Sequence, residues 1–405
     1  MFDSIDQNVR FPELEAEILR FWEEQRIFRA ALEKPAPRGP YIFYEGPPTA
    51  NGRPGIHHVS ARAFKDLYPR YRTMRGYHVE RRGGWDTHGL PVEVEIEKEI
   101  GSTGKQDIEK FGIAEFNRRC RESVFRYTQD WNRLTERIGF WIDLEAAYIT
   151  YQNSYIESCW WILKSLWERR LLFEDYKTTM HCPRCNTSLA DHEVSQGMRE
   201  DVDDPSIWPK FPAERSGLVR AGLLPAGETR PVFYLAWTTT PWTLGANVAL
   251  AVNGGAEYGL FEARSAYGKE DERTELFILA ASLAEKVFGE GRYQVLKTFP
   301  GSALVGLRYQ QILNGRVPEG QSLESAFRLI ADEMVAIEEG TGIVHIAPAY
   351  GDLEVGRRHD LPTIFSVDFS GKVYPEVNAP EAAESVGPYH GLFFKDADRL
   401  ITRDL

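Results

Sequence analysis

Two segments in the first quarter of the chain combine glycine, proline, histidine and carboxylate residues in an order that suits a phosphate-bearing ligand. They read YEGPPTANGRPGIHH over residues 44–58 and GWDTHGLPVE over residues 84–93. Glycines let the backbone approach such a ligand, and a following helix N-terminus offers free N–H groups and a partial positive charge. His57 and His58 are suited to hydrogen-bond ATP oxygens and to stabilise charge developing on the α-phosphate. This pattern alone predicts a nucleotide site, although glycine-rich turns before helices are common.

A second chemical pattern is the pair of cysteines in the sequence Cys182-Pro-Arg-Cys185, which is one half of a zinc site. A tetrahedral structural site needs four ligands. The other possible ligands are two cysteines predicted to be buried in helices and two nearby histidines: Cys120, Cys159, His181 and His192. The alternative interpretation of the pair is a tight turn with unmetallated thiols.

The elements that must position the first two segments form a βαβ unit. A short extended run over residues 41–44 leads into the glycine-rich turn, and the next segment, residues 57–76, is predicted to be a helix that ends at Gly76. Residues 77–86 then form a second predicted strand. Strand, glycine-rich loop, helix and strand are the unit of a doubly wound nucleotide-binding sheet. Before them, residues 11–28 are predicted to be a helix with Pro12 in its first turn.

Residues 105–170 are predicted to be mostly helical. Apolar residues that recur every three or four positions mark one buried stripe that ends at Gly139: Ile113, Phe116, Cys120, Val124, Tyr127, Trp131, Leu134 and Ile138. Cys120 lies on this stripe and Cys159 lies on the next predicted helix. Both are therefore expected to be core residues rather than reactive thiols.

The composition of the sequence changes after about residue 195. Short polar and proline-rich segments come first, and short apolar runs typical of β-strands follow. Glycine, asparagine or charged turns separate the runs, which are PVFYLAW, ANVALAV, ELFIL, YQVLKTF, FRLIAD and TGIVHIA. This pattern indicates a mainly β module over about residues 200–385, and a small barrel is one fold that fits it.

The composition bounds the class of protein. A chain of 405 residues suits two domains, and its hydrophobic and charged content is that of a folded globular protein. No run approaches eighteen apolar residues and the N-terminus lacks the pattern of a signal peptide, so neither a spanning helix nor secretion is expected. Four cysteines do not make a disulfide framework, which favours a reducing cytoplasm.

Charge is unevenly spread along the chain. The net charge of −12 argues against unspecific nucleic-acid binding by the whole molecule. Between Arg53 and Arg82, however, eight basic residues stand against two acidic ones. A local positive face fits a bound polyanion such as ATP or a tRNA end, and a solvated helix face is the alternative.

Five sequence blocks in order carry a family resemblance: EGPPTANG, GWDTHGLPVE, CPRC, WTTTPWTL and GTGIVHIAP. Together they closely resemble isoleucyl-tRNA synthetases over essentially the whole chain, and the second and fourth blocks point to isoleucine rather than valine or leucine. The resemblance implies an α/β fold, with a Rossmann-like class I synthetase catalytic half and an inserted β-rich, barrel-like editing domain. The implied parts are residues 1–198, the editing domain 199–385, and a return toward the catalytic domain over 386–405.

The resemblance implies an isoleucine–tRNA ligase that activates isoleucine with ATP and Mg²⁺, transfers it to tRNA(Ile) and hydrolyses valyl products. One missing methylene changes binding too little to reject valine, a limit for which the isoleucine enzyme is itself the standard example. The KMSKS-like loop, the anticodon-binding region and the family's second CxxC are not found in this sequence. We therefore expect this chain to activate isoleucine weakly and to bind zinc weakly or not at all. The resemblance also implies a monomer. The alternatives are a stand-alone editing hydrolase and a non-catalytic tRNA-binding paralogue.

The resemblance also implies roles for residues of the synthetic site. Pro47 and Asp86 match positions that line the isoleucine pocket, where a carboxylate holds the α-ammonium through a charge-assisted hydrogen bond. The alternative role for Asp86 is that of a loop cap.

The adenylate-forming signature departs from the family. The family pattern is His-x-Gly-His, whereas this chain has Gly55, Ile56, His57 and His58. In one interpretation His57 and His58 both serve the phosphates and Gly55 absorbs a change in the backbone; in the other, activation is impaired. We expect inhibitors that mimic isoleucyl-adenylate to bind less well here, and the double substitution Gly55→His with His57→Gly in a full-length version tests this.

The editing residues implied by the resemblance lie on two walls of one pocket. One wall is the threonine-rich segment and the other is the segment GTGIVH with a following carboxylate; the residues are Thr238, Thr239, Thr240, Thr243, Asn247, His345 and Asp352. The carboxylate of Asp352 would anchor the α-amino group, in a segment two residues shorter than the family spacing. The hydroxyls and the imidazole would position the tRNA ribose and the attacking water. Plain β propensity is the alternative reason for the threonines.

Overall fold

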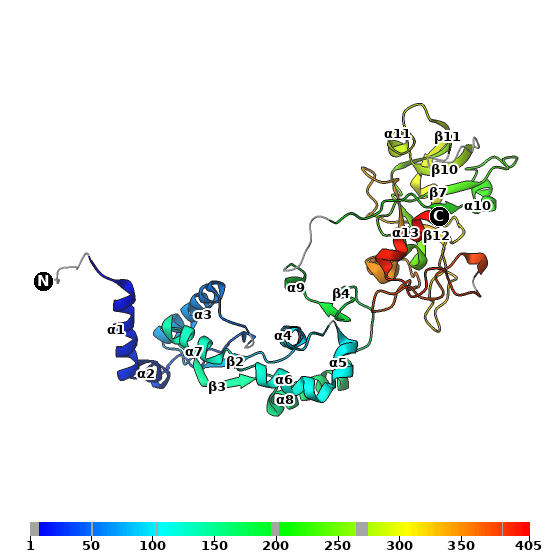
Figure 1. Cartoon of the computed structure of the whole chain (residues 1–405). Coiled ribbons are helices and arrows are strands. Elements are labelled where there is room, and N and C mark those ends of the chain that lie inside the picture. The colour runs from blue at the N-terminus through cyan, green and yellow to red at the C-terminus, as the bar shows by residue number, and fades with distance from the viewer. Residues whose placement is uncertain (1–7, 50–51, 103, 196–201, 265–273, 383) are drawn as a thin grey trace. The chain divides into compact units, whose positions relative to one another are not determined.

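The computed structural model describes residues 8–49, 52–102, 104–195, 202–264, 274–382 and 384–405. The chain forms two compact units, Met1–Asp175 and Tyr176–Leu405, and each is described by itself (Figure 1). The predicted boundary at 198/199 lies outside the described residues. None of the described helices is long and apolar enough to cross a membrane.

The first unit is built on a parallel sheet of three strands in the order β1-β2-β3. These strands are β1 (Phe43–Tyr44), β2 (Arg81–Trp85) and β3 (Asp143–Ile149). The helix α3 (Ile56–Met74) connects β1 to β2, so the predicted βαβ unit is confirmed. Gly84 in β2 permits close packing against β3, because a Cβ atom there would lie 2.4 Å from the ring of Tyr148.

The first predicted helix is divided into α1 (Phe11–Glu24) and α2 (Ile27–Glu33). The break falls at Arg26, whose backbone is left-handed with φ of 51°. Aromatic residues of both helices pack against Trp141, with ring centroids at 5.1 Å for Trp22 and 5.8 Å for Phe28. The guanidinium of Arg70 lies 3.9 Å from the centroid of Trp141, so an aromatic and cationic cluster fastens these helices to the sheet.

The region predicted to be mostly helical contains helices and one strand that sequence reasoning missed. The helices that follow β2 are α4 (Leu90–Ile100), α5 (Lys105–Phe111), α6 (Ile113–Ser123), α7 (Thr128–Arg137) and α8 (Asn153–Glu168). The strand β3 lies between α7 and α8 and pairs with β2. Its residues are half-buried or exposed, so neither face of the strand is fully covered. Its sequence, DLEAAYI, accordingly shows no regular alternation of apolar and polar residues.

The predicted buried stripe is largely confirmed, since Phe116, Val124 and Trp131 are almost fully buried. Two parts of that prediction are wrong. Ile113, at the first residue of α6, is exposed. Cys159 is only half-buried, because no residue of α8 is buried in the described structure.

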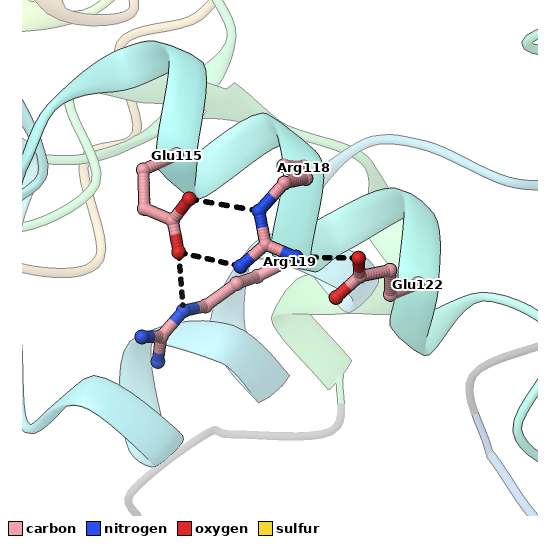
Figure 2. Close-up of polar contacts among 4 residues, drawn as sticks. All are labelled: Glu115, Arg118, Arg119 and Glu122. Atoms are coloured by element: carbon pink, nitrogen blue, oxygen red, sulfur yellow. Dashed lines mark hydrogen bonds and ion pairs between the residues drawn. The ribbon is translucent and has the colours of Figure 1, made fainter.

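The outer face of α6 carries a network of charged residues, which Figure 2 shows. The carboxylate of Glu115 accepts two hydrogen bonds from Arg118, at 2.8 and 2.7 Å, and one from Arg119 at 3.1 Å. Arg118 also donates to Glu122 at 2.5 Å. These arginines, Arg118 first, lower the pKa of Glu115 to about 2. The spacing of three and four residues makes this a solvated, self-neutralised helix face.

The second unit begins with a hairpin of β4 (Met180–Cys182) and β5 (Thr187–Leu189), followed by α9 (Asp191–Ser195). Its larger sheet has the order β11-β9-β10-β7-β6. The strands of that sheet are β6 (Lys210–Pro212), β7 (Val232–Leu235), β9 (Glu257–Arg264), β10 (Thr274–Ala280) and β11 (Tyr293–Pro300). A smaller sheet, β12-β8-β13, consists of β8 (Ala249–Val252), β12 (Arg328–Ala331) and β13 (Ile343–Ile346).

All six predicted β-type runs contain strands, whereas β6 and β9 were not predicted. The described strands after β5 form a five-stranded and a three-stranded sheet and no closed barrel. Short helices connect and cover them: α10 (Arg215–Arg220), η1 (Pro241–Ala246), η2 (Ala281–Leu283), α11 (Ala284–Phe288), η3 (Gly301–Leu304), η4 (Pro348–Tyr350), α12 (Leu353–Arg358), η5 (Pro380–Ala382) and α13 (Phe394–Asp404). Residues of both sheets and of α13 share one large apolar core, which holds η1 in place.

Candidate functional site

The glycine-rich turn ends where α3 begins, with Gly55 as the N-cap residue. His58 turns back on this cap, and its Nδ1 accepts the N–H of Gly55 at 2.9 Å. Because Nδ1 is an acceptor, the neutral imidazole carries its proton on Nε2. Burial, and then the neighbouring His57 and Arg62, lower the pKa of His58. His58 is therefore a neutral hydrogen-bond donor through Nε2.

The two exchanged residues, Gly55 and His57, lie against each other. The ring of His57 folds back over Gly55, where a Cβ atom would lie 2.9 Å from its Cε1 and 3.0 Å from its Nδ1. The two imidazole centroids, of His57 and His58, are 3.8 Å apart. Gly55 itself has an extended backbone, with φ of −111° and ψ of 172°. Gly55 therefore has a backbone conformation that any residue adopts, and its role in absorbing a change of the loop stays a prediction.

Side chains of α3 and α7 fix the turn to the body of the unit. The indole Nε1 of Trp131 donates to the carbonyl of Gly52 at 2.7 Å. The ring of Trp131 also packs edge-to-face against His58, with centroids 4.6 Å apart. The guanidinium of Arg62 lies 4.7 Å from the centroid of the same indole and donates to Thr135 at 3.1 Å. A shallow depression lined by Arg53, Pro54 and Asp130 adjoins this turn.

The basic stretch does not form one exposed face. Arg81 is buried and donates to Thr73, and Arg70 binds Asp66 and the carbonyl of Gly139. Arg62 is likewise buried, as described above. Four of the eight basic residues bond to buried or half-buried partners in this way: Arg62, Lys65, Arg70 and Arg81. Their charges are therefore used to hold the first unit together.

The two predicted amino-acid-binding segments lie side by side. The N–H of Asp86 donates to the carbonyl of Pro48 at 3.1 Å, which brings Asp86 next to the segment that contains Pro47. The carboxylate of Asp86 is partly exposed and lies 3.6 Å from Nδ1 of His88. His88 in turn contacts the hydroxyl of Thr150 at 3.2 Å, so it holds the loop.

Sequence reasoning missed a buried carboxylate beside the segment that contains Pro47. Glu45, directly after β1, is buried and accepts from Nζ of Lys65 at 2.7 Å. The same ammonium donates to the carbonyl of Gly46 at 3.3 Å. The hydroxyl of Tyr148 donates to the carbonyl of Glu45 at 2.7 Å. A carboxylate at a strand end, followed by a lysine on the next helix, was the available signal.

The predicted zinc ligands lie on a tight turn between β4 and β5. The N–H of Cys185 donates to Sγ of Cys182 at 3.4 Å, and Asn186 takes a left-handed backbone with φ of 55°. Nε2 of His181 lies 2.7 Å from the carbonyl oxygen of Phe369. Across the described ranges, no group of three or more His, Cys, Asp or Glu side chains is arranged to hold a metal ion. These residues do not fit a complete zinc site, and zinc stays a prediction.

Three of the predicted editing threonines meet the predicted histidine in one buried cluster of the second unit. Nε2 of His345 lies 3.3 Å from the hydroxyl of Thr238 and 3.2 Å from that of Thr243. The hydroxyl of Thr240 lies 3.3 Å from Thr238 and 3.2 Å from Thr243. Thr238 ends the segment after β7, Thr243 lies in η1 and His345 lies in β13, so three elements converge.

The hydrogen bonds of this cluster assign the tautomer of His345. The hydroxyl of Thr243 donates its proton to the carbonyl of Thr240 at 2.7 Å, so toward the imidazole it can only accept. Nε2 of His345 therefore carries the proton, and Nδ1 has a lone pair with no partner within the described residues. Burial lowers the pKa of His345 to about 4, so the ring is neutral at pH 7.

The other predicted editing residues lie outside this cluster. Thr239 is exposed. Asn247 is fully buried; its amide donates to the carbonyl of Ala249 at 2.9 Å and accepts from the hydroxyl of Tyr309 at 2.6 Å. Asp352 directly precedes α12 without a side-chain capping bond to it, and its carboxylate accepts the N–H of Ala347 at 2.8 Å. Burial raises the pKa of Asp352, against the effect of that hydrogen bond.

Comparisons with known proteins agree on one family. Residues 17–339 match the model of tRNA synthetases class I (I, L, M and V). The isoleucine–tRNA ligase of Dehalococcoides mccartyi is 43% identical over all of this chain, which spans 40% of that relative's length. That of Thermus thermophilus is 47% identical over 98% of this chain and 35% of the relative. The match to the editing domain of a cytosolic leucyl-tRNA synthetase from P. knowlesi covers 50% of this chain and 93% of that structure. The identity is 15%, and the TM-score of 0.35 is low. The chain therefore belongs to the class I tRNA synthetases of the I, L, M and V group.

Proposed function

We propose that this chain is part of an isoleucine–tRNA ligase that activates isoleucine with ATP and Mg²⁺, transfers it to tRNA(Ile) and hydrolyses valyl products. The names of the relatives that match the whole chain at 43–47% identity support the choice of amino acid. The chain spans 35–40% of those relatives, so the reactions of the complete enzyme are part of the proposal.

In the proposed synthetic site, the phosphates of ATP lie at the N-terminus of α3. The free N–H groups of the first helical turn and the Nε2–H of His58 donate to phosphate oxygens there. Asp86 binds the α-ammonium of isoleucine and Pro47 lines the pocket for its side chain. The ion pair of Lys65 with Glu45 supports this arrangement, because it holds the backbone at Gly46, next to Pro47.

In the proposed editing site, water attacks the carbonyl carbon of the ester between valine and the tRNA 3′ end. The C–O bond of the ester breaks, valine leaves, and the ribose hydroxyl takes up a proton. The single observation that carries this proposal is the buried cluster of Thr238, Thr243 and neutral His345, at 3.2–3.3 Å. Such fixed hydroxyl and imidazole groups position a ribose hydroxyl and a water without needing to reorganise.

The remaining residues of the editing proposal have supporting roles. One carboxylate oxygen of Asp352 holds the backbone of Ala347, and the other is proposed to bind the α-ammonium of the mischarged valine. Thr239 and Asn247 complete the two walls. We propose that the five-stranded and three-stranded sheets of the second unit form the barrel-like editing domain over residues 199–385, and that the pair Cys182 and Cys185 contributes to a zinc site completed elsewhere in the protein.

The test is deacylation of Val-tRNA(Ile) by the purified 405-residue chain, with Ile-tRNA(Ile) as the control substrate. We expect hydrolysis of the valyl ester alone, and His345→Ala should lower its rate by at least about tenfold. The exposed Thr229→Val, in the same unit, is the matched control and should hydrolyse at the wild-type rate. Hydrolysis of neither ester by a folded chain would refute the editing part of the proposal.

A second candidate is a stand-alone editing hydrolase. The observation that favours it is that the whole Thr238, Thr240, Thr243 and His345 cluster is complete within this chain. Because weak activation is expected of the 405-residue chain itself, ATP–pyrophosphate exchange with isoleucine must be measured on a full-length version: hydrolysis without exchange there supports the hydrolase, and hydrolysis with exchange supports the ligase. Loss of both reactions with retained tRNA binding would indicate a tRNA-binding paralogue.

A further inference from the structure

The helical turn η1, which carries Thr243, is capped by a carboxylate from the other end of the second unit. Oδ1 of Asp398, in α13, accepts the backbone N–H of Trp242 at 2.8 Å. This N–H lies in the first turn of η1, where a backbone donor has no partner within the helix. Asp398 is therefore an N-terminal cap supplied by a residue 156 positions away.

The carboxylate of Asp398 is deeply buried, and only one of its two oxygens has a hydrogen-bond partner among the described residues. Asp398 is 1% exposed, and its Oδ2 has no hydrogen-bond partner among the residues that the structure describes. The charged groups that act on it are Lys395, one turn earlier in α13, and Asp204 from the segment before β6. These two form an ion pair with each other. Burying a carboxylate without full pairing is costly, so this position is not explained by stability.

The indole of Trp242 is held on two sides. Its ring packs edge-to-face against Tyr350 with centroids 4.6 Å apart, and against Phe394, the first residue of α13, at 4.9 Å. The hydroxyl of Tyr350 accepts the N–H groups of Ser366 and Val367, each at 3.1 Å. The residue after Trp242 is Thr243, whose hydroxyl contacts His345, so one peptide unit joins the cap to the reactive cluster.

We propose that Asp398 is a positioning residue for the hydrolytic site: by accepting the Trp242 N–H it fixes η1, and with η1 the hydroxyl of Thr243 relative to His345. This inference rests on the proposed editing function. Asp398 touches neither the substrate nor the cluster itself, so its effect is exerted on the rate of hydrolysis through geometry. A displacement of about 1 Å at a reacting group can cost roughly 100-fold in rate.

The test compares two substitutions in the 405-residue chain. Asp398→Leu fills the same space but removes the acceptor, whereas Asp398→Asn keeps an acceptor oxygen and removes the charge. We expect Asp398→Leu to lower kcat for Val-tRNA(Ile) hydrolysis by about 10- to 100-fold with little change in KM, and Asp398→Asn to stay within about threefold of wild type. The exposed Asp396→Ala, on the same helix, is the matched control and should equal wild type.

Thermal unfolding of the same variants separates positioning from stability. We expect the melting temperature of Asp398→Leu to stay level or rise, because a buried carboxylate is removed, while its activity falls. If Asp398→Leu does not fold, Asp398→Ser, whose hydroxyl is too short to reach the Trp242 N–H, replaces it in both measurements. Wild-type hydrolysis by either variant that lacks the acceptor, or a loss in Asp398→Asn as large as in Asp398→Leu, would overturn the inference. If wild type itself does not hydrolyse the ester, the proposed function fails instead.

Discussion

The neutral, buried His345 leads to a specific dependence of stability on pH. Its pKa is about 4 in the folded chain, against about 6.5 for an unperturbed histidine. Between these two values the unfolded chain binds more protons than the folded one, so acid favours unfolding. The stabilisation is present above pH 6.5 and is lost as the pH falls toward 4.

The magnitude follows from the two pKa values. Linkage over the interval from pH 7 to pH 4.5 gives a loss of about 2 kcal/mol in the free energy of unfolding from this one group. His345→Gln removes the titration and keeps an N–H donor for Thr238 and Thr243. We compare the free energy of unfolding of wild type with that of His345→Gln at each pH. The wild-type value minus the His345→Gln value should fall by about 2 kcal/mol as the pH is lowered from 7 to 4.5.

Urea unfolding at pH 7, 6, 5 and 4.5, followed by tryptophan fluorescence, measures this difference. Other titrating groups, including Asp398, are common to both proteins and cancel in the comparison. A difference that stays constant within about 0.5 kcal/mol across the range would refute the conclusion that His345 is buried and neutral. A loss that is already complete at pH 6 would place the pKa of His345 near its ordinary value and refute it as well.

Three further predictions concern other positions. Gly55→Ala should lower the stability of the first unit by no more than about 1 kcal/mol, the cost of a poorer N-cap residue, because the exposed ring of His57 can rotate away from the new Cβ; adding His57→Ala should leave the melting temperature of Gly55→Ala unchanged, and its recovery would show that the ring is fixed. Asp398→Asn should raise the unfolding free energy at pH 7.5 by about 3 kcal/mol, because burial raises the pKa of Asp398 to about 6 and thereby disfavours its charged form in the folded chain; the gain should fall to about 0.5 kcal/mol near pH 4, and an equal gain at both pH values would contradict this cause. Trp131→Phe should destabilise the first unit by about 1 kcal/mol through loss of the bond to Gly52, measured by urea unfolding against wild type, and no change would show that this bond contributes nothing.

The sequence was a good guide where the determining interactions are local. The six β-type runs were identifiable because short apolar runs alternate with turn residues, and the βαβ unit because a glycine-rich turn joins a strand to a helix with a clear stop at Gly76. It failed at β3 and β9, whose strands are stabilised by pairing with neighbours rather than by their own pattern. The prediction that Cys159 is a core residue failed for a related reason. Helical spacing predicts an apolar face but does not say whether another element covers that face.

Residue types and spacing indicated the histidines after the glycine-rich turn and the paired cysteines as groups available for chemistry, and the family resemblance added Asp86, the threonines and His345. Tertiary structure decided what those groups can do. Contacts between residues about 100 or more positions apart give His345 its tautomer and its low pKa, and give η1 a cap from Asp398. Local sequence carries no information on such contacts, because protonation, burial and hydrogen-bond partners belong to the folded environment of a side chain rather than to its neighbours along the chain.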